Sequence, residues 1–211
     1  MKRFHNFYAT FIIALLSSIS GFGQRESVQI FEAETISELY INADEVFKIT
    51  LETTQTDKIK LAVFSEGEYT QQIGIKTEQK GNQLHIFSAY PEILTSGYDK
   101  LSAHKVFAVI LHITLPKHKK VIIQSNIASV YASGTYNYFE TELTSGKCSL
   151  TSFSGEAIIN TIKGDVLIET NQANLETSST YGSIKTPPKH PDGQKISAKS
   201  IYGNIIVKKT Q

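Results

Sequence analysis

The stretch SGEAIINTIKGDVLIET, residues 154 to 170, decides the fold. Its glycines, Gly155 and Gly164, are nine residues apart, and each is followed by one residue and then by an alternating apolar run. Steps of nine residues find further segment starts at Ala128, Asn137, Gly146, Ala173 and Gly182, and after a shift of three residues at Gln194 and Gly203. Two positions after every start lies an apolar residue: Val130, Phe139, Cys148, Ala157, Val166, Leu175, Ile184, Ile196 and Ile205. Such alternation turns one face of a short strand toward an interior.

From Gly146 onward, every second segment start is a glycine, whereas the residue at the starts between them varies. We call the first series strict and the second looser. The strict series is Gly146, Gly164, Gly182 and Gly203, and the looser series is Asn137, Gly155, Ala173 and Gln194. This predicts a β-solenoid whose coil has about 18 residues, with two strands and two corners. We expect each strand to bond to its equivalent in the coils above and below, and the corner glycines to supply positive φ. The alternative is an antiparallel meander, because hairpins also repeat every 8 to 12 residues.

The residues before the repeats predict irregular β-structure with little helix. Short alternating runs fill residues 28 to about 115, Gly81 marks a hairpin turn, and the most apolar strand spans residues 104 to 116. We therefore predict an all-β protein in three parts. Residues 1–23 are a signal peptide, residues 24–119 an N-terminal β region that caps the solenoid, and residues 120–211 the β-solenoid repeats.

Several of these segments resemble a known family. VFAVILHITLPKHKKVIIQSN (106–126), SGEAIINTIKGDVLIET and STYGSI (179–184) are similar to the bacterial putative-adhesin family of unknown function, the toastrack type of β-solenoid domain. Leu115-Pro116-Lys117 and Gly164-Asp165-Val166 match its motifs, whereas the other starts read Gly-Lys, Gly-Glu, Gly-Ser and Gly-Asn. The resemblance covers most of the mature chain, best from 104 to 207. It implies an exported, all-β, non-enzymatic protein of the envelope or surface, with no catalytic motif to carry over.

The N-terminus predicts export. Lys2 and Arg3 precede a short apolar segment and small residues, which is typical of a signal peptide cleaved near Gly23. We expect a periplasmic, cell-surface or extracellular protein that is not a lipoprotein and has no transmembrane segment after cleavage. Without those two cations the chain has 19 basic and 20 acidic residues, so no basic face predicts nucleic-acid binding.

We expect no catalytic, cofactor-binding or metal site. Cys148, the single cysteine, occupies an inward position and is interpreted as core. His104 and His112 are about 26 Å apart along an extended strand, so they cannot share a metal ion without a bend. Glu140, Glu156 and Glu176 are expected on one outward face, with Glu140 two strands from Glu176 and Ile158 between them.

The predicted interaction surface combines those carboxylates with Leu167 and Ile206, which face outward on the other side with Lys185 between them. The partner is expected to be an envelope or surface macromolecule, either protein or glycan. These features favour an adhesin-like or scaffold module. Two alternatives stay open: a carbohydrate-active β-helix enzyme, and a structural protein that self-associates end to end. Against self-association, Lys208 and Lys209 on the last strand are interpreted as a charged guard of the final sheet edge.

Overall fold

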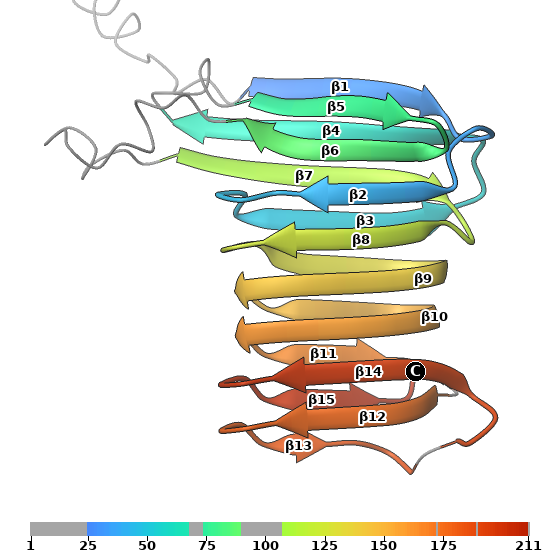
Figure 1. The fold of residues 1–211 in the computed structure, drawn as a ribbon, viewed down its shortest axis with the longest axis vertical. Helices are drawn as coiled ribbons and strands as arrows, with labels where there is room; N and C mark the ends of the chain where they lie inside the picture. Colours follow the sequence, from blue (N-terminus) through green and yellow to red (C-terminus); the bar gives the residue numbers. More distant parts are fainter. Residues whose placement is uncertain (1–24, 68–73, 90–106, 172, 189, 211) are drawn as a thin grey trace, which may run out of the picture.

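The computed structural model describes residues 25–67, 74–89, 107–171, 173–188 and 190–210; the predicted signal peptide and its cleavage site lie outside these ranges. The described residues form fifteen strands of one continuous sheet that folds into two facing layers (Figure 1). The strands are β1 (Arg25–Glu32), β2 (Glu38–Asn42), β3 (Lys48–Thr54), β4 (Lys58–Gly67), β5 (Gly74–Lys80), β6 (Gln83–Ala89), β7 (Phe107–Pro116), β8 (Lys120–Ser125), β9 (Ser129–Ser145), β10 (Cys148–Lys163), β11 (Val166–Glu169), β12 (Ala173–Ser179), β13 (Ile184–Lys185), β14 (Gln194–Ser200) and β15 (Ile205–Lys208).

The two layers are defined by the strand pairing. Layer I has the order β1, β4, β7, β3, the first half of β9, the first half of β10, β11, β15 and β13. Layer II has the order β5, β6, β2, β8, the second halves of β9 and β10, β14 and β12. Figure 1 shows both layers as a stack, with β1 and β5 at one end and β12 and β13 at the other.

Strands β9 and β10 give the geometry of one coil. Each crosses from layer I to layer II, and the two pair in parallel with Cys148 opposite Val130 and Ala157 opposite Phe139. Both pairs are 18 residues apart. The register shifts on either side of Ser154, where β10 turns the corner. Parallel pairing of successive repeats confirms the all-β solenoid and excludes the meander, whose neighbouring strands would be antiparallel.

The coils do not stack in the order of the sequence. Ile196 of β14 lies between Ala157 of β10 and Leu175 of β12. On layer I, β15 lies between β11 and β13 in the same way. The last coil, β14 and β15, is thus inserted between two earlier coils, and the expectation that each repeat stacks on the next is wrong at this end.

The residues that carry the three-residue shift connect the displaced coils. Residues 186–188 and 190–193 lie between β13 on layer I and β14 on layer II, which is one rung nearer the middle of the stack. The connection is anchored to the end coil, because the His190 amide donates to the carbonyl of Ala173 at 3.1 Å. The three additional residues therefore allow the chain to step back past the end coil to the next rung inward.

An equivalent insertion occurs near the N-terminal end. Strand β2 pairs in parallel with both β6 and β8, and β3 pairs in parallel with both β7 and β9. The coil formed by β2 and β3 thus lies between two coils that follow it in the sequence. The expected boundary between residues 119 and 120 falls at the start of β8, and it stays a prediction. Beyond β7, strands β1 and β4 add antiparallel rungs, and β5 forms the expected hairpin with β6.

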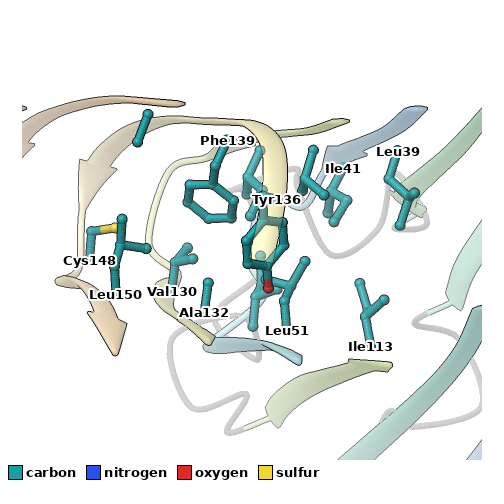
Figure 2. Close-up of a cluster of buried hydrophobic side chains, with 14 of the residues drawn as sticks. Leu39, Ile41, Leu51, Ile113, Val130, Ala132, Tyr136, Phe139, Cys148 and Leu150 are labelled. Carbon is teal, nitrogen blue, oxygen red and sulfur yellow. The ribbon is translucent and has the colours of Figure 1, made fainter. Parts of the chain in front are cut away.

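The core fills the space between the two layers. Figure 2 shows Leu39 and Ile41 from layer II and Leu51 from layer I directed into this space. At one corner, Tyr136 makes an edge contact with Phe139 and stacks on Phe153. Each fully buried side chain of this size contributes about 1.5–3 kcal/mol of transfer free energy. At the β1 and β5 end the core is closed by a polar contact, in which Thr77 donates to Gln29 at 2.8 Å.

The strict glycines form one column along a corner, and close approach explains them better than backbone conformation. Gly146 has a φ of 93°, but Gly164, Gly182 and Gly203 have no positive φ in the left-handed region. A Cβ on Gly164 would lie 1.9 Å from the carbonyl oxygen of Gly146, and one on Gly203 would lie 1.8 Å from that of Gly164. The expectation of positive φ is therefore wrong for three of the four. At the other corner, Gly155 has a φ of 143°.

Candidate binding surfaces

The outward face of layer II carries a row of polar side chains in one register. The pairing places one residue on each of six successive rungs, in the order Asn42, Gln124, Glu142, Asn160, Lys199 and Ser178. In-register parallel strands hold equivalent side chains one rung apart, which is about 4.8 Å. The row therefore extends over about 24 Å of rigid sheet.

This row forms one wall of a hollow of about 740 Å³ that follows the corner after the layer II strands. We call it the corner groove. Its lining residues are Asn42, Asp44, Gln124, Ser125, Asn126, Glu142, Leu143, Thr144, Asn160, Thr161, Ile162, Ser178, Thr180, Lys199, Ser200 and Ile201. Ten of these sixteen residues are neutral and polar, three are charged and three are aliphatic. The groove is a polar channel across six coils, with two carboxylates and one ammonium among its lining residues.

Hydrogen bonds fix the groove end nearest β2. The Gln124 amide donates to Glu142 at 2.9 Å, and Asn126 donates its backbone amide to Asp44 at 3.1 Å. Asn126 also exchanges hydrogen bonds with Glu45, accepting from its backbone amide at 2.8 Å and donating its side-chain amide to its carboxylate at 2.6 Å. Farther along, Asn160 has no side-chain hydrogen-bond partner among the described residues. The middle of the groove therefore offers an amide that is free to bond to a ligand.

A second polar cluster lies on layer II beside the groove. Tyr138 donates to Glu140 at 2.7 Å, and Tyr40 donates to Glu38 at 2.9 Å. Partial burial, the hydrogen bond to Glu140 and the nearby carboxylates raise the pKa of Tyr138 to about 12. The Lys120 ammonium lies 5.9 Å from the Tyr40 ring and 5.8 Å from the Tyr138 ring, which suits cation–π attraction. This cluster is satisfied internally.

Three residues of the predicted interaction surface come together on layer I. Leu167 lies opposite Ile206, and Ile206 lies opposite Lys185. The order expected from sequence, with Lys185 between the other two, is wrong because β15 is inserted between β11 and β13. Leu167 is half-buried, whereas Ile206 is 40% exposed. They form a short apolar strip that ends at a lysine, and a role in binding remains a prediction.

The three predicted carboxylates lie on layer II, so they do not share a face with that strip. Glu140 is opposite Ile158, Ile158 is opposite Ser197, and Ser197 is opposite Glu176. Two rungs therefore separate Glu140 from Glu176, and the single intervening Ile158 expected from sequence is wrong for the same topological reason. Glu156 and Glu176 are exposed.

The remaining chemical candidates lie apart from one another. Burial raises the pKa of the Cys148 thiol to about 12, and the side chain has no exposed surface. Asp165 accepts from the amide of Asn204 at 2.7 Å, which makes it a corner residue. No group of three histidine, cysteine or acidic side chains suited to a metal ion occurs within the described ranges. His104 lies outside them.

Lys208 is the last residue of β15, which pairs with β11 as far as Glu169 but with β13 only at Ile205 and Ile206 among the described residues. Its ammonium lies 2.7 Å from the carboxylate of Glu169. The strand that comes last in the sequence is thus not the last in the stack, and a role of Lys208 and Lys209 as edge guards stays a prediction. The exposed edges at this end belong to β12 and β13.

The corner groove was not among the predicted sites, although the repeats contain a signal for it. Five positions after each looser start lie Glu142, Asn160, Ser178 and Lys199, which are all polar. A position on the outward face that is polar in every coil is normally interpreted as a solvent-exposed position. Only the three-dimensional course of the corner shows that these side chains line a hollow.

Comparison with solved structures identifies the fold. The crystal structure of a putative cell adhesion protein from Clostridium sporogenes matches with a TM-score of 0.63 and 15% identity, over 89% of this chain and 100% of that chain. A putative adhesin from Bacteroides fragilis matches over 89% of this chain and 98% of that chain, with 11% identity and a TM-score of 0.38. The expected resemblance to proteins described as adhesins is confirmed at the level of fold. No protein-family model and no curated protein sequence matches the chain.

Helices of membrane-spanning length and hydropathy are not found in the part of the chain that the structure describes.

Proposed function

We propose that this protein is an exported, non-enzymatic, adhesin-like module that binds a macromolecule of the bacterial envelope or surface. The observation that carries the proposal is the corner groove, a continuous polar channel over six rungs of a rigid double-layered sheet. The residues of its walls belong largely to paired strands, so the protein itself loses little conformational entropy when a long partner binds. The fold shared with a protein named for cell adhesion supports the same role.

A carbohydrate-active enzyme is the weaker candidate. Glycoside cleavage needs two carboxyl groups at a defined separation across the bond that is cut. The carboxylates of the groove, Asp44 and Glu142, accept hydrogen bonds from the Asn126 amide and from Gln124. They act there as structural acceptors, so the groove is better suited to binding than to proton transfer.

Export is the second part of the proposal. It is supported by the signal-peptide pattern of residues 1–23. We propose a periplasmic or surface location without a lipid anchor. Expression of a C-terminally tagged chain followed by fractionation tests this, with the expected result of a shortened chain outside the cytoplasm. Retention of the full-length chain in the cytoplasm would contradict it.

Binding is tested with the purified chain on isolated bacterial envelopes and on intact cells. We expect saturable retention that untagged protein competes away. The predicted strip on layer I is tested by Leu167→Asp/Ile206→Asp, with Lys185→Ala as a milder change of the same row. Equal retention of all variants would show that this strip is not the contact surface. A complete lack of saturable retention would refute the adhesin-like role.

One observation favours a second candidate, a self-associating structural protein. Strands β12 and β13 end the stack, and their outer edges have no partner strand within the described residues. Unpaired edges are templates for adding further strands. Light scattering over a concentration series tests this: growth into long particles would support it, and a constant particle mass would remove it.

A further inference from the structure

We infer that the corner groove binds a linear, neutral glycan chain laid along the axis of the stack. The inference rests on the proposed binding function and adds to it the chemical class of the ligand and the residues that recognise it. Three properties of the groove support it: the chemistry of its lining, the polar side chain that recurs on every rung, and two exposed isoleucines in the lining.

The lining chemistry separates a glycan from other ligand classes. A nucleic acid or a phosphorylated ligand would need a cluster of cations, whereas Lys199 is the one basic residue in the lining. A protein partner is usually anchored by aromatic or arginine side chains, and the lining contains neither. Amides and hydroxyls prevail instead. Each amide offers donors and an acceptor, which matches the hydroxyl groups of a sugar.

The repetition of the groove matches a repeating ligand. Asn160 and Lys199 occupy neighbouring rungs in register, with Glu142 on one side and Ser178 on the other. Each rung thus presents a polar side chain at intervals of about 4.8 Å. A polymer of similar units can meet a polar side chain on every rung of the channel, whereas a compact ligand would use only part of its length of about 24 Å.

Two isoleucines of the groove lining supply the apolar contact that a sugar ring also requires. Ile162 and Ile201 lie side by side, because the Tyr202 amide bonds to the carbonyl of Ile162 at 3.0 Å. Their side chains are 42% and 39% exposed in the groove lining. A pyranose ring has polar edges and an apolar C–H face. The isoleucines can cover that face while Asn160 and Thr144 bond to the hydroxyls.

The experiment uses the purified chain on an array of neutral and anionic glycans, followed by titration calorimetry with the best-bound oligosaccharide. Asn160→Ala and Thr180→Ala remove groove contacts, and the matched control is Asn137→Ala, an exposed asparagine outside the groove. Thermal unfolding checks that each variant is folded. We expect at least one neutral glycan of several units to bind, with Asn160→Ala raising the dissociation constant about tenfold, or about 1.4 kcal/mol. Asn137→Ala should leave it unchanged.

Failure of this inference is distinguishable from failure of the proposed function. Retention on envelopes without binding to any neutral glycan would overturn the inference and leave the adhesin-like role standing. Selective binding to anionic glycans, or glycan binding that folded Asn160→Ala and Thr180→Ala leave intact, would also overturn it. If the chain binds neither glycans nor envelopes, both conclusions fall.

Discussion

The Gly203→Ala substitution tests why glycine recurs at the strict corner. Gly203 is buried, and its φ lies outside the left-handed region, so an alanine there meets no conformational penalty of its own. The obstacle is a neighbouring coil. The new Cβ would lie 1.8 Å from the carbonyl oxygen and 2.4 Å from the carbonyl carbon of Gly164, where ordinary contact begins at 3.4 Å. Because the obstructing atoms are backbone, a side-chain rotation cannot relieve the clash.

The expected cost follows from the hydrogen bonds that hold the two coils together at this corner. Separating them strains the Val166 amide bond to Asn204 at 2.8 Å, the Asn204 amide bond to Asp165 at 2.7 Å, and the Tyr202 amide bond to Ile162 at 3.0 Å. Three such bonds contribute about 3 kcal/mol in net terms. Overpacking strain adds about 1–3 kcal/mol. We therefore expect Gly203→Ala to lower the free energy of unfolding by about 4–6 kcal/mol.

Urea unfolding followed by circular dichroism measures this loss, with the slope on denaturant concentration checked against the wild type. Gly74→Ala is the matched control, because a Cβ there meets nothing within 4 Å and the residue has no positive φ. We expect it to change stability by less than about 1 kcal/mol. A Gly203→Ala protein within about 1 kcal/mol of the wild type would refute the argument that close approach selects glycine.

Four further predictions test the order of the coils, the buried thiol and the lysine that ends β15. Leu167→Cys/Ile206→Cys should form a disulfide on oxidation, because the two residues lie on paired rungs about 4.8 Å apart. Leu167→Cys/Lys185→Cys should not, because these residues are two rungs apart and a disulfide spans at most about 7 Å between Cα atoms. The reverse result in non-reducing electrophoresis would contradict the inserted order of the coils. Burial raises the pKa of Cys148 from 9.0 to about 12, so above pH 9 the unfolded state binds fewer protons than the native state and the free energy of unfolding should fall as pH rises toward 12. Thiol reagents should label Cys148 only as fast as the protein opens, and rapid labelling at pH 8 would show that the site is accessible. Lys208→Ala should lower the free energy of unfolding by less than about 1 kcal/mol, because the lysine side chain of the ion pair is 52% exposed. The particle mass in light scattering should not change. Added association of the variant would support a role of Lys208 as an edge guard.

The coil itself could be predicted from the sequence because its cause is local. Alternation after Gly155 and Gly164 specifies which side chains turn inward, and this pattern gives the 18-residue register of β9 and β10 directly. The order of the coils could not be predicted in this way. Every coil presents the same inward pattern, so alternation alone does not distinguish a sequential stack from one with an inserted coil.

Specific polar contacts carry the information that alternation lacks. Asp165 accepts from Asn204, and Asn204 accepts from the amide of Ser183 at 2.9 Å. This chain of corner contacts runs in the spatial order of β11, β15 and β13. In the sequence these three residues are similar small or polar corner residues, and nothing in their spacing indicates which of them meet.

The candidate site was predicted only in part for a related reason. Leu167 and Ile206 were correctly placed on one outward face, since parity along a strand determines the face. Their neighbours were assigned wrongly because neighbours across strands depend on coil order. The corner groove depends on the shape of the corner as well, which residue types at the outward positions do not reveal.

The inserted coil has a consequence for how the chain reaches its native state. Among the described residues, β12 pairs only with β14 and β13 only with β15, so the coil made of β12 and β13 has no partner strand there until residues 194–208 are in place. Before that, β12 and β13 can dock directly on β10 and β11 with their apolar residues facing inward. A stack formed in that order would have to release the end coil before β14 and β15 could enter. The native order is therefore reached only if β14 and β15 take the place beside β10 and β11, either first or by displacing the end coil.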